Sequence, residues 1–524
     1  MGYWSKAPMD RDQIVLFAPT LDSWIPEGHP ARLFDEILST LDWSQWEAQY
    51  VGCVGQPPIH PKILAGVILY GLSMGIRRSR MLERLCANSI DYLWLTCGRG
   101  IDHSTICKFR TKFSKELKDV FRQIGRLCMS MGLISLNQVG LDGTQIRSNN
   151  SRDRVYSAEQ IERRLIELDA QIEQMFSEAQ AADEQDQDLF GSSSPSSLPP
   201  ELCSLQKRKQ ALEKALASQE KIVARRSRHV KVRERPARIP VTDPDSLILP
   251  SKEGGYAPNY TTMVAVDSQN GFILDADVTG DGDESHMTVP TVERIEERFE
   301  QKPDQLLADS SHGTGRNLQE LEDRGIEAYI PVSGQVIKQD NPAERDDLTK
   351  AVPVSQWHKL ARTSQSGKKL AKSAFVYDSS SDCYYCPMGR RLPYLRSFLE
   401  AKKWGKVCIR QYRSLCCSDC PLARSCLIGK ARLRSVYRDE FESARQRAIE
   451  RMGSAKGQEI YANRKWLCET PFAVIKGYMK IRSFLLRGLE KVRTEWLWIC
   501  TSYNLSKLAR ELVGMRVRFC TMPA

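Results

Sequence analysis

The sequence predicts an α/β fold, a mixed sheet flanked by helices, together with a helical N-terminal region. Two patterns predict this class. Between residues 240 and 335, apolar runs of strand length alternate with helical segments, which is typical of a sheet whose later strands are parallel. Residues 1–135 instead space their apolar residues at helical intervals. The 524 residues are enough for about two to four domains and a large buried core.

The composition indicates a globular protein with an anionic partner. Hydrophobic residues make up 41% of the chain, charged residues make up 27%, and the net charge is +11. A positive balance favours polyanions as partners but does not determine the fold. No apolar run approaches the roughly 18 residues that a membrane-spanning helix needs, and the N-terminus lacks the apolar core of a signal peptide. We therefore expect a cytoplasmic protein.

Residues 1–135 are expected to form a helical domain that binds DNA. After the turn at residues 98–100, Ser104 is expected to cap a helix that buries Ile106 and Phe109. A helix, a turn and a second helix rich in cations resemble a helix-turn-helix reader of the major groove. A plain helical hairpin with a solvated face explains the same pattern. The cations expected to meet phosphates are Arg77, Arg78, Lys108 and Arg110.

Residues 136–156 are expected to form the first strand of the sheet. Val139, Leu141 and Thr144 fit a buried strand, and Asp142 interrupts it. A buried carboxylate is costly unless it is paired or bound to a metal ion. The alternative is a turn aspartate in front of Gly143, because Asp-Gly is a common hairpin sequence.

Residues 157–226 are expected to be an insertion that forms a two-helix hairpin. Apolar residues recur at three- and four-residue steps from Ile161 to Phe176 and again from Leu205 to Ile222. A polar segment at residues 191–200, GSSSPSSLPP, is expected to form its flexible tip.

Residues 227–345 carry the remaining strands of the expected sheet. Residues 261–267 and 272–278 are of strand type and are joined by a turn at Asn270-Gly271. Asp309 follows the strand residues Leu306 and Leu307, and ligands of open α/β sheets gather at the carboxyl ends of strands. A helix cap or a loop acid is the alternative explanation of Asp309.

Residues 346–440 form a cysteine-rich insertion. Two CxxC pairs, separated by thirty residues, have the spacing of a structural zinc site. Reduced thiols without a metal are the alternative. The expected ligands are Cys383, Cys386, Cys417 and Cys420, with Cys426 as an alternative for one position.

Residues 441–524 are expected to be a helical part that carries Glu469. Between Tyr461 and Leu489, this residue is the only carboxylate among cations and aromatic side chains, a composition that attracts a phosphate backbone. Neighbouring cations keep such an acid ionised, so that it can share a divalent cation with other acids. A basic amphipathic helix, in which Glu469 pairs with Lys465 or Lys476, is the alternative.

These segments together resemble the bacterial insertion-sequence DDE transposases, whose catalytic domain has an RNase H-like fold. The resemblance covers nearly the whole chain and rests on LDGTQI, GGYAPNYTTMVAVD, LLADSSHGTGRN and RKWLCETPFAVIKG. It implies that Asp142, Asp309 and Glu469 are an acidic triad that holds Mg²⁺, for which Mn²⁺ can substitute. The residues around the glutamate that are expected to bind phosphates are Tyr461, Arg464, Lys465 and Lys476.

The resemblance also implies an activity and partners. Such a protein binds the terminal inverted repeats of its element, cleaves DNA strands and transfers them to target DNA. It is expected to work at the bacterial nucleoid as a homodimer or larger assembly on double-stranded DNA. A nuclease that cuts without joining and an inactive DNA-binding derivative of a transposase are the alternatives.

Three features depart from the family pattern. Arg464 lies five residues before Glu469, one more than is typical, so Arg464 or Lys465 could take its role. Pro471 is expected to kink the helix, or to lie in the first turn of a helix that begins near Thr470. His312 stands where related chains tend to have an aromatic residue, and the sequence assigns it no role.

Overall fold

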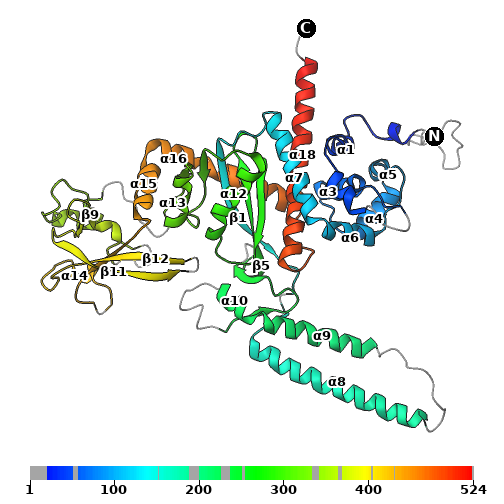
Figure 1. The fold of residues 1–524 in the computed structure, drawn as a ribbon, viewed down its shortest axis with the longest axis horizontal. Coiled ribbons are helices and arrows are strands. Elements are labelled where there is room, and N and C mark those ends of the chain that lie inside the picture. The colour runs from blue at the N-terminus through cyan, green and yellow to red at the C-terminus, as the bar shows by residue number, and fades with distance from the viewer. Residues whose placement is uncertain are drawn as a thin grey trace, which may run out of the picture. The chain divides into compact units, whose positions relative to one another are not determined.

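The structure, a computed structural model, describes residues 20–50, 57–151, 153–187, 200–225, 236–250, 254–332, 341–363, 369–402, 405–429 and 431–521. The chain divides into two compact units, whose elements are labelled in Figure 1. A helical unit comprises Met1–Met131 and Phe472–Ala524, and a sheet unit comprises Gly132–Pro471. None of the helices in the described ranges is long and apolar enough to cross a membrane.

A six-stranded mixed sheet forms the centre of the sheet unit. Its strands are β1 (Gln138–Arg147), β4 (Leu247–Pro250), β5 (Tyr256–Asp267), β6 (Ile273–Thr279), β7 (Gln305–Leu307) and β8 (Glu327–Tyr329). The strand order is β4-β5-β1-β7-β8, and β6 also pairs with β5. β5 is antiparallel to β1, whereas β7 is parallel to both β1 and β8. Helices α12 (Thr288–Phe299) and α13 (Gly315–Asp323) accompany the parallel strands, so the predicted α/β class is confirmed.

Strand β1 continues without a turn through Asp142 and Gly143. Asp142 pairs with Val264 and Gly143 with Met263 in the antiparallel ladder with β5, so the interpretation of Asp142 as a hairpin-turn residue is wrong. A Cβ atom at position 143 would lie 1.8 Å from Oε2 of Glu284, so the Glu284 carboxylate occupies the space beside Gly143. The Asp-Gly pair therefore places Asp142 within the strand, and the missing side chain of Gly143 leaves room for the Glu284 carboxylate next to it.

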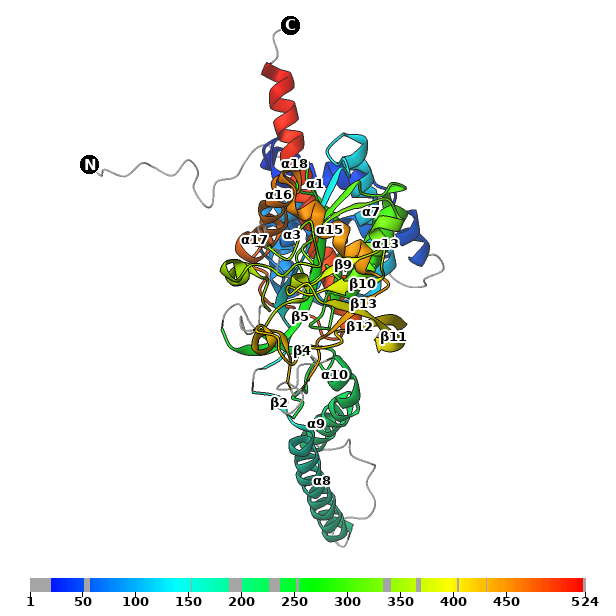
Figure 2. The ribbon, with the colours of Figure 1, turned by 90° about the vertical axis from the view of Figure 1, so that its left-hand side faces the viewer.

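The insertion after β1 is a helical hairpin, as expected. Helix α8 (Ala158–Gln187) packs along α9 (Pro200–Ala217), which is followed by α10 (Gln219–Arg225) (Figures 1 and 2). Ile161, Leu168 and Leu212 are buried in their shared core. The expected tip, apart from Pro200, lies outside the described residues.

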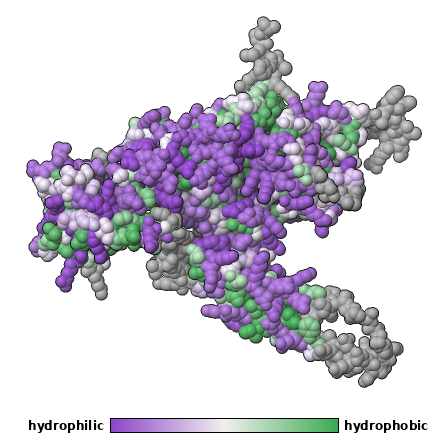
Figure 3. Space-filling view, viewed as in Figure 1, coloured by the Kyte–Doolittle hydropathy of each residue, from purple (hydrophilic) through white to green (hydrophobic). Residues whose placement is uncertain are grey.

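The cysteine-rich part contains a second, five-stranded sheet in the order β13-β12-β11-β10-β9. Its elements are β9 (Val376–Asp378), β10 (Cys383–Tyr385), β11 (Arg391–Lys402), β12 (Gly405–Arg413), α14 (Ala423–Cys426) and β13 (Ser435–Asp439). Tyr384, Leu392 and Tyr412 are buried in its core. Hydrophobic residues also show on the surface of this part (Figure 3), where Leu395 and Leu399 of β11 are exposed.

The helical unit is built from residues of both the N-terminal and the C-terminal part of the chain. Its helices are α1 (Pro30–Ser39), α2 (Ser44–Glu47), α3 (Pro61–Ser73), α4 (Ser79–Asn88), α5 (Ile90–Thr96), α6 (His103–Lys112), α7 (Ser114–Ser130) and α18 (Leu489–Thr521). Trp498 Nε1 donates to the carbonyl of Arg110 at 3.1 Å, and Ser502 Oγ donates to the carbonyl of Leu69 at 2.7 Å. The expected C-terminal part, residues 441–524, is therefore divided. Helices α15 (Glu442–Gly453) and α16 (Ala455–Ala462) belong to the sheet unit, and the chain from Phe472 onward packs with the N-terminal helices.

Two local expectations are corrected. Asp102, not Ser104, caps α6, because its carboxylate accepts the backbone N–H groups of Ser104 and Thr105. Helix α17 (Arg464–Ala473) begins well before Thr470, so Pro471 lies inside it and not in its first turn. A π-helical turn, Val474–Tyr478, follows directly. Proline removes one backbone donor, and a wider turn is one way for a helix to accommodate that loss.

Two arginines expected to meet DNA are held inside the helical unit. Arg110 is only 6% exposed, and burial lowers its pKa while Glu495 opposes that shift. Arg77 Nη2 donates to the carbonyl of Ser483 at 2.6 Å and lies 3.6 Å from Oε1 of Glu495. Glu495 is 4% exposed and also accepts the backbone N–H groups of Leu485 and Leu486. The burial of Arg110 contradicts the expectation that it meets phosphates, and Arg77 is largely buried beside Glu495.

The substitution Glu495→Ala should destabilise the helical unit strongly. It leaves Arg77 and Arg110 buried beside no acid, and breaking a buried ion pair from one side costs about 3–5 kcal/mol. Thermal unfolding followed by circular dichroism should show a clearly lower midpoint. Glu490→Ala on the same helix is the control, since the Glu490 side chain is 84% exposed and its pair with Arg493 is a surface pair. Equal midpoints for the two variants would contradict a structural role for Glu495.

Candidate active site

Asp142 and Asp309 are brought together by the register of two parallel strands. In the β1–β7 pair, Gly140 lies opposite Leu307. Asp142 and Asp309 each stand two residues beyond these partners, and the charges of both act on Glu284 and on Arg464. Adjacent strands lie about 4.8 Å apart, which is a separation that one or two metal ions can bridge. Asp309 is thus at the carboxyl end of a parallel strand, as the sequence predicted.

Glu284 is a third acid at this place, and the sequence analysis missed it. It lies between β6 and α12, and its carboxylate fills the space above Gly143. Burial raises the pKa of Glu284 to about 7, and the charges of Asp309 and Asp142 add to the shift. The Ser311 hydroxyl lies 2.5 Å from Oδ1 of Asp309 and 3.2 Å from Oε1 of Glu284. Three carboxyl groups therefore share one partly buried position.

Arg464 is the cation of this group. Its Nη2 lies 3.0 Å from Oδ1 of Asp142. Although burial raises the pKa of Asp309, hydrogen bonds from Ser311 and the charge of Arg464 bring it below the usual value. Arg464 is the first residue of α17, which packs directly on β1. A Cβ atom at Gly140 would lie 2.7 Å from Leu467 and 2.8 Å from Cys468.

His312 completes the cluster from the loop before α13. Its side chain is fully buried, and its Nδ1 lies 2.9 Å from the hydroxyl oxygen of Thr288. Its Nε2 has no hydrogen-bond partner in the described structure. Burial lowers the pKa of His312 to about 4, although Asp309 opposes this shift, so the ring is neutral at physiological pH. One ligand atom from each of Glu284, Asp309 and His312 lies within 4.8 Å of the others.

Glu469 is placed differently from the two aspartates. It lies on the exposed surface of α17, one residue after the buried Cys468 that packs on β1. Burial and the charge of Asp142 raise the pKa of the Cys468 thiol to about 12. The group of close ligand atoms at the acid cluster does not include Glu469. Its role as the third acid of the triad stays a prediction.

The other predicted phosphate-binding residues are distributed over both units. Tyr461 on α16 is partly buried near Arg464 and Asp309, and burial raises its pKa. Lys465 is exposed on α17, and Lys476 is partly buried in the π-helical turn of the helical unit. Arg78 and Lys108 are exposed. Lys465, Arg78 and Lys108 are thus open to an external partner, unlike the buried Arg110.

The cysteines gather without forming a closed zinc site. Burial raises the pKa of Cys426 to about 12, with smaller contributions from Cys417, Cys386 and Cys420. Cys383 is instead a neighbour of Arg391, whose pKa it raises through a hydrogen bond. Among the described residues, the groups of three or more ligand atoms within 4.8 Å include none of these cysteines. The grouping favours Cys426 over Cys383 as the fourth ligand, and zinc itself stays a prediction.

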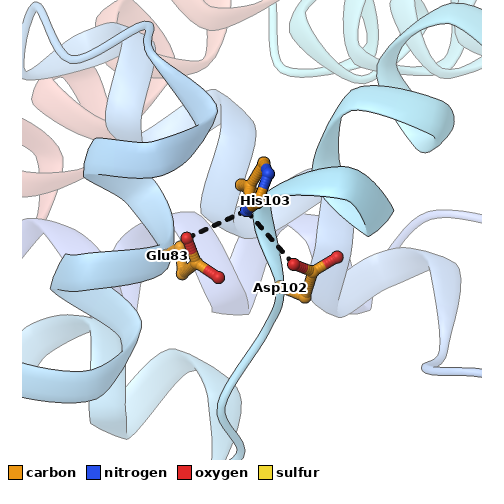
Figure 4. A group of neighbouring side chains, drawn as sticks. All are labelled: Glu83, Asp102 and His103. Carbon is orange, nitrogen blue, oxygen red and sulfur yellow. Dashed lines mark hydrogen bonds and ion pairs between the residues drawn. The ribbon is translucent and has the colours of Figure 1, made fainter.

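A second group of possible ligands lies in the helical unit (Figure 4). Nδ1 of His103 is 3.1 Å from Oε2 of Glu83 and 3.2 Å from Oδ1 of Asp102. Asp102 is already engaged as the cap of α6, and Glu83 is on α4. One ring nitrogen of His103 lies near both carboxylates, and its contact with Glu83 links α4 to α6.

Comparison with known proteins gives two partial matches. Residues 385–509 match the family model of a transposase DDE domain, and residues 19–112 match the model of a transposase domain, DUF772. No curated protein matches the chain. The first match contains Arg464 and Glu469, and the second contains the N-terminal helices α1 to α6. From these two matches we conclude that the chain belongs to the insertion-sequence DDE transposases.

Proposed function

We propose that this protein is an active transposase that binds the ends of its element, cleaves DNA there and transfers the strands to a target. Membership of the family implies transposase catalysis, DNA binding and the use of divalent metal ions. The observation that carries the proposal is the ion pair of Arg464 with Asp142, at a place where the charges of Asp142 and Asp309 both act on Arg464 and on Glu284. This arrangement supports an active enzyme over an inactive DNA-binding derivative.

The residues present fit divalent metal ions. Carboxylate oxygens are the ligands that Mg²⁺ and Mn²⁺ favour. Burial, and then the charges of Asp309 and Asp142, raise the pKa of Glu284, and a cation would offset both effects. Asp142 and Asp309 would hold the ions, and we propose that Glu469 completes the set when DNA is bound. When bound, such ions polarise a phosphoryl oxygen and make a hydroxyl group more nucleophilic.

The protein groups around the acids have separate tasks in this proposal. Arg464 balances the charge of Asp142 and presents a planar fork that suits a phosphate. Tyr461 stands beside it as a partly buried hydroxyl that can hydrogen-bond a phosphate oxygen. Ser311 holds Asp309 in its ionised form through its hydroxyl and backbone N–H, so this acid stays a ligand and does not take up a proton.

The helical unit is the proposed DNA-binding part. Exposed Arg78 and Lys108, with Lys112 at the end of α6, give it cations that can reach phosphates. Such contacts give affinity and position, and they depend on salt. We propose double-stranded terminal repeats and target DNA as the partners, and pairing of two element ends by two or more copies of the chain.

Asp142→Asn and Asp309→Asn should each abolish strand cleavage while DNA binding survives. Losing a metal-ligand carboxylate removes several kcal/mol of transition-state stabilisation, so we expect a loss of roughly 1000-fold or more. Labelled DNA from the ends of the element, incubated with Mg²⁺, would be scored for nicks and for strand-transfer products, and gel shifts would report binding. Asp304→Asn is the matched control, since Asp304 is exposed at the opposite end of β7.

Wild-type cleavage by either active-site variant would contradict the proposed site. Cleavage by the wild-type protein without any strand-transfer product would indicate a nuclease on the same fold. Binding without cleavage under every metal condition would indicate an inactive derivative.

Lys108→Ala should weaken binding to all DNA sequences to a similar extent. Removal of one phosphate contact lowers the slope of log affinity against log salt by about 1. Fluorescence anisotropy over a salt series, with terminal-repeat and unrelated duplexes, would measure it. Lys118→Ala serves as the control, since Lys118 is an exposed lysine of α7 and not of α6. An unchanged slope for Lys108→Ala would exclude α6 from the phosphate contacts.

A further inference from the structure

We propose that Glu284 and His312 are ligands, together with Asp309, of a divalent transition-metal site with one nitrogen and two carboxylate donors. The inference deepens the proposed function, because it adds two residues to the acid centre and rests on that proposal for the role of Asp309. Ligand atoms of the three residues lie within 4.8 Å of one another. They come from three segments of the chain, one before α12, one directly after β7 and one before α13.

The hydrogen bonds around His312 determine which nitrogen faces the cluster as an acceptor. Thr288 Oγ1 donates to the carbonyl of Ser285 at 2.9 Å and accepts from Asn317 Nδ2 at 3.0 Å. With that proton given to the Ser285 carbonyl, the contact of 2.9 Å with His312 places a proton on Nδ1 of the ring. A neutral ring protonated on Nδ1 has its lone pair on Nε2, which is the tautomer that binds a metal through Nε2.

The free lone pair is the observation that separates a metal site from a cluster of acids. His312 is fully buried, and its Nε2 has no hydrogen-bond partner within the described ranges. A buried polar atom without a partner is unusual and costly. Ligand atoms of Glu284 and Asp309 lie within 4.8 Å of a ring nitrogen of His312, so an anion would be repelled here, whereas a cation would satisfy the histidine and the acids together.

The surroundings hold the ligands in place as a metal site requires. Asn317 Nδ2 also contacts the carbonyls of Ser285 and His312, at 2.8 and 3.0 Å, so it ties the histidine loop to the segment that carries Glu284. Ser311 contacts both carboxylates. Gly143 leaves the space that the Glu284 carboxylate occupies. Such secondary contacts orient the direct ligands of metal sites.

The donor set predicts which ion is preferred. Mg²⁺ favours oxygen ligands and keeps several of its waters, whereas imidazole nitrogen suits transition metals. A site with one imidazole should therefore favour Mn²⁺ over Mg²⁺ more strongly than a site of carboxylates alone. Replacing His312 should remove that preference and leave the carboxylate contribution in place.

The test is Mn²⁺ binding to the full-length protein without DNA. Pulsed electron paramagnetic resonance of bound Mn²⁺ should detect coupling to an imidazole nitrogen, and titration of free Mn²⁺ should give the affinity. His312→Gln should lose the nitrogen coupling and bind Mn²⁺ at least about 10-fold more weakly, with a smaller change for Mg²⁺. Glu284→Gln should weaken both ions and keep the coupling. His286→Gln is the matched control, since His286 is half-exposed and outside the cluster.

The wild-type spectrum tests the nitrogen ligand directly, even if a variant fails to fold. No nitrogen coupling in the wild-type protein, or coupling that persists in folded His312→Gln, would overturn the inference. DNA cleavage without nitrogen coupling would leave the proposed function standing and refute only this site. Nitrogen coupling in a protein that never cleaves DNA would support the metal site and contradict the proposed function.

Discussion

The parallel pairing of β1 with β7 is the constraint on which the candidate site depends. Because Gly140 lies opposite Leu307, the acids two residues further along come side by side. Ionised carboxylates at such a distance repel each other. The chain offsets this repulsion with Arg464, whose helix docks where Gly140 leaves room for Leu467 and Cys468. Strand register and helix docking are therefore two parts of one electrostatic arrangement.

Much of the fold could be predicted because it depends on local patterns. Alternating apolar runs indicated the sheet, helical spacing indicated the hairpin after β1, and the position of Asp309 after Leu307 indicated the carboxyl end of a strand. Each of these features follows from side-chain period or from a strand end. The pairing of Asp142 with Asp309 follows from the same rules once the two strands are parallel neighbours.

The features that were missed depend on contacts between distant residues. Glu284 lies in a short run of acids between a strand and a helix, which has the appearance of a solvated loop, and only the fold puts it above Gly143. Arg77 and Arg110 have the spacing of exposed cations, but in the fold both interact electrostatically with Glu495, a residue far along the chain. The cap of α6 was expected at Ser104 but lies two residues earlier, at Asp102, whose carboxylate accepts two backbone N–H groups.

The helical unit has a consequence for how the protein is made. Trp46 stacks on Phe109 and meets Trp498 of α18 with ring centroids 6.3 Å apart, so its core draws on both ends of the chain. Contacts of such long sequence separation form slowly, and apolar surface that waits for its partner is prone to aggregate. The N-terminal helices therefore reach their final packing only after the ribosome has released α18. A prematurely terminated copy that lacks α18 would carry a helical unit without part of its aromatic core.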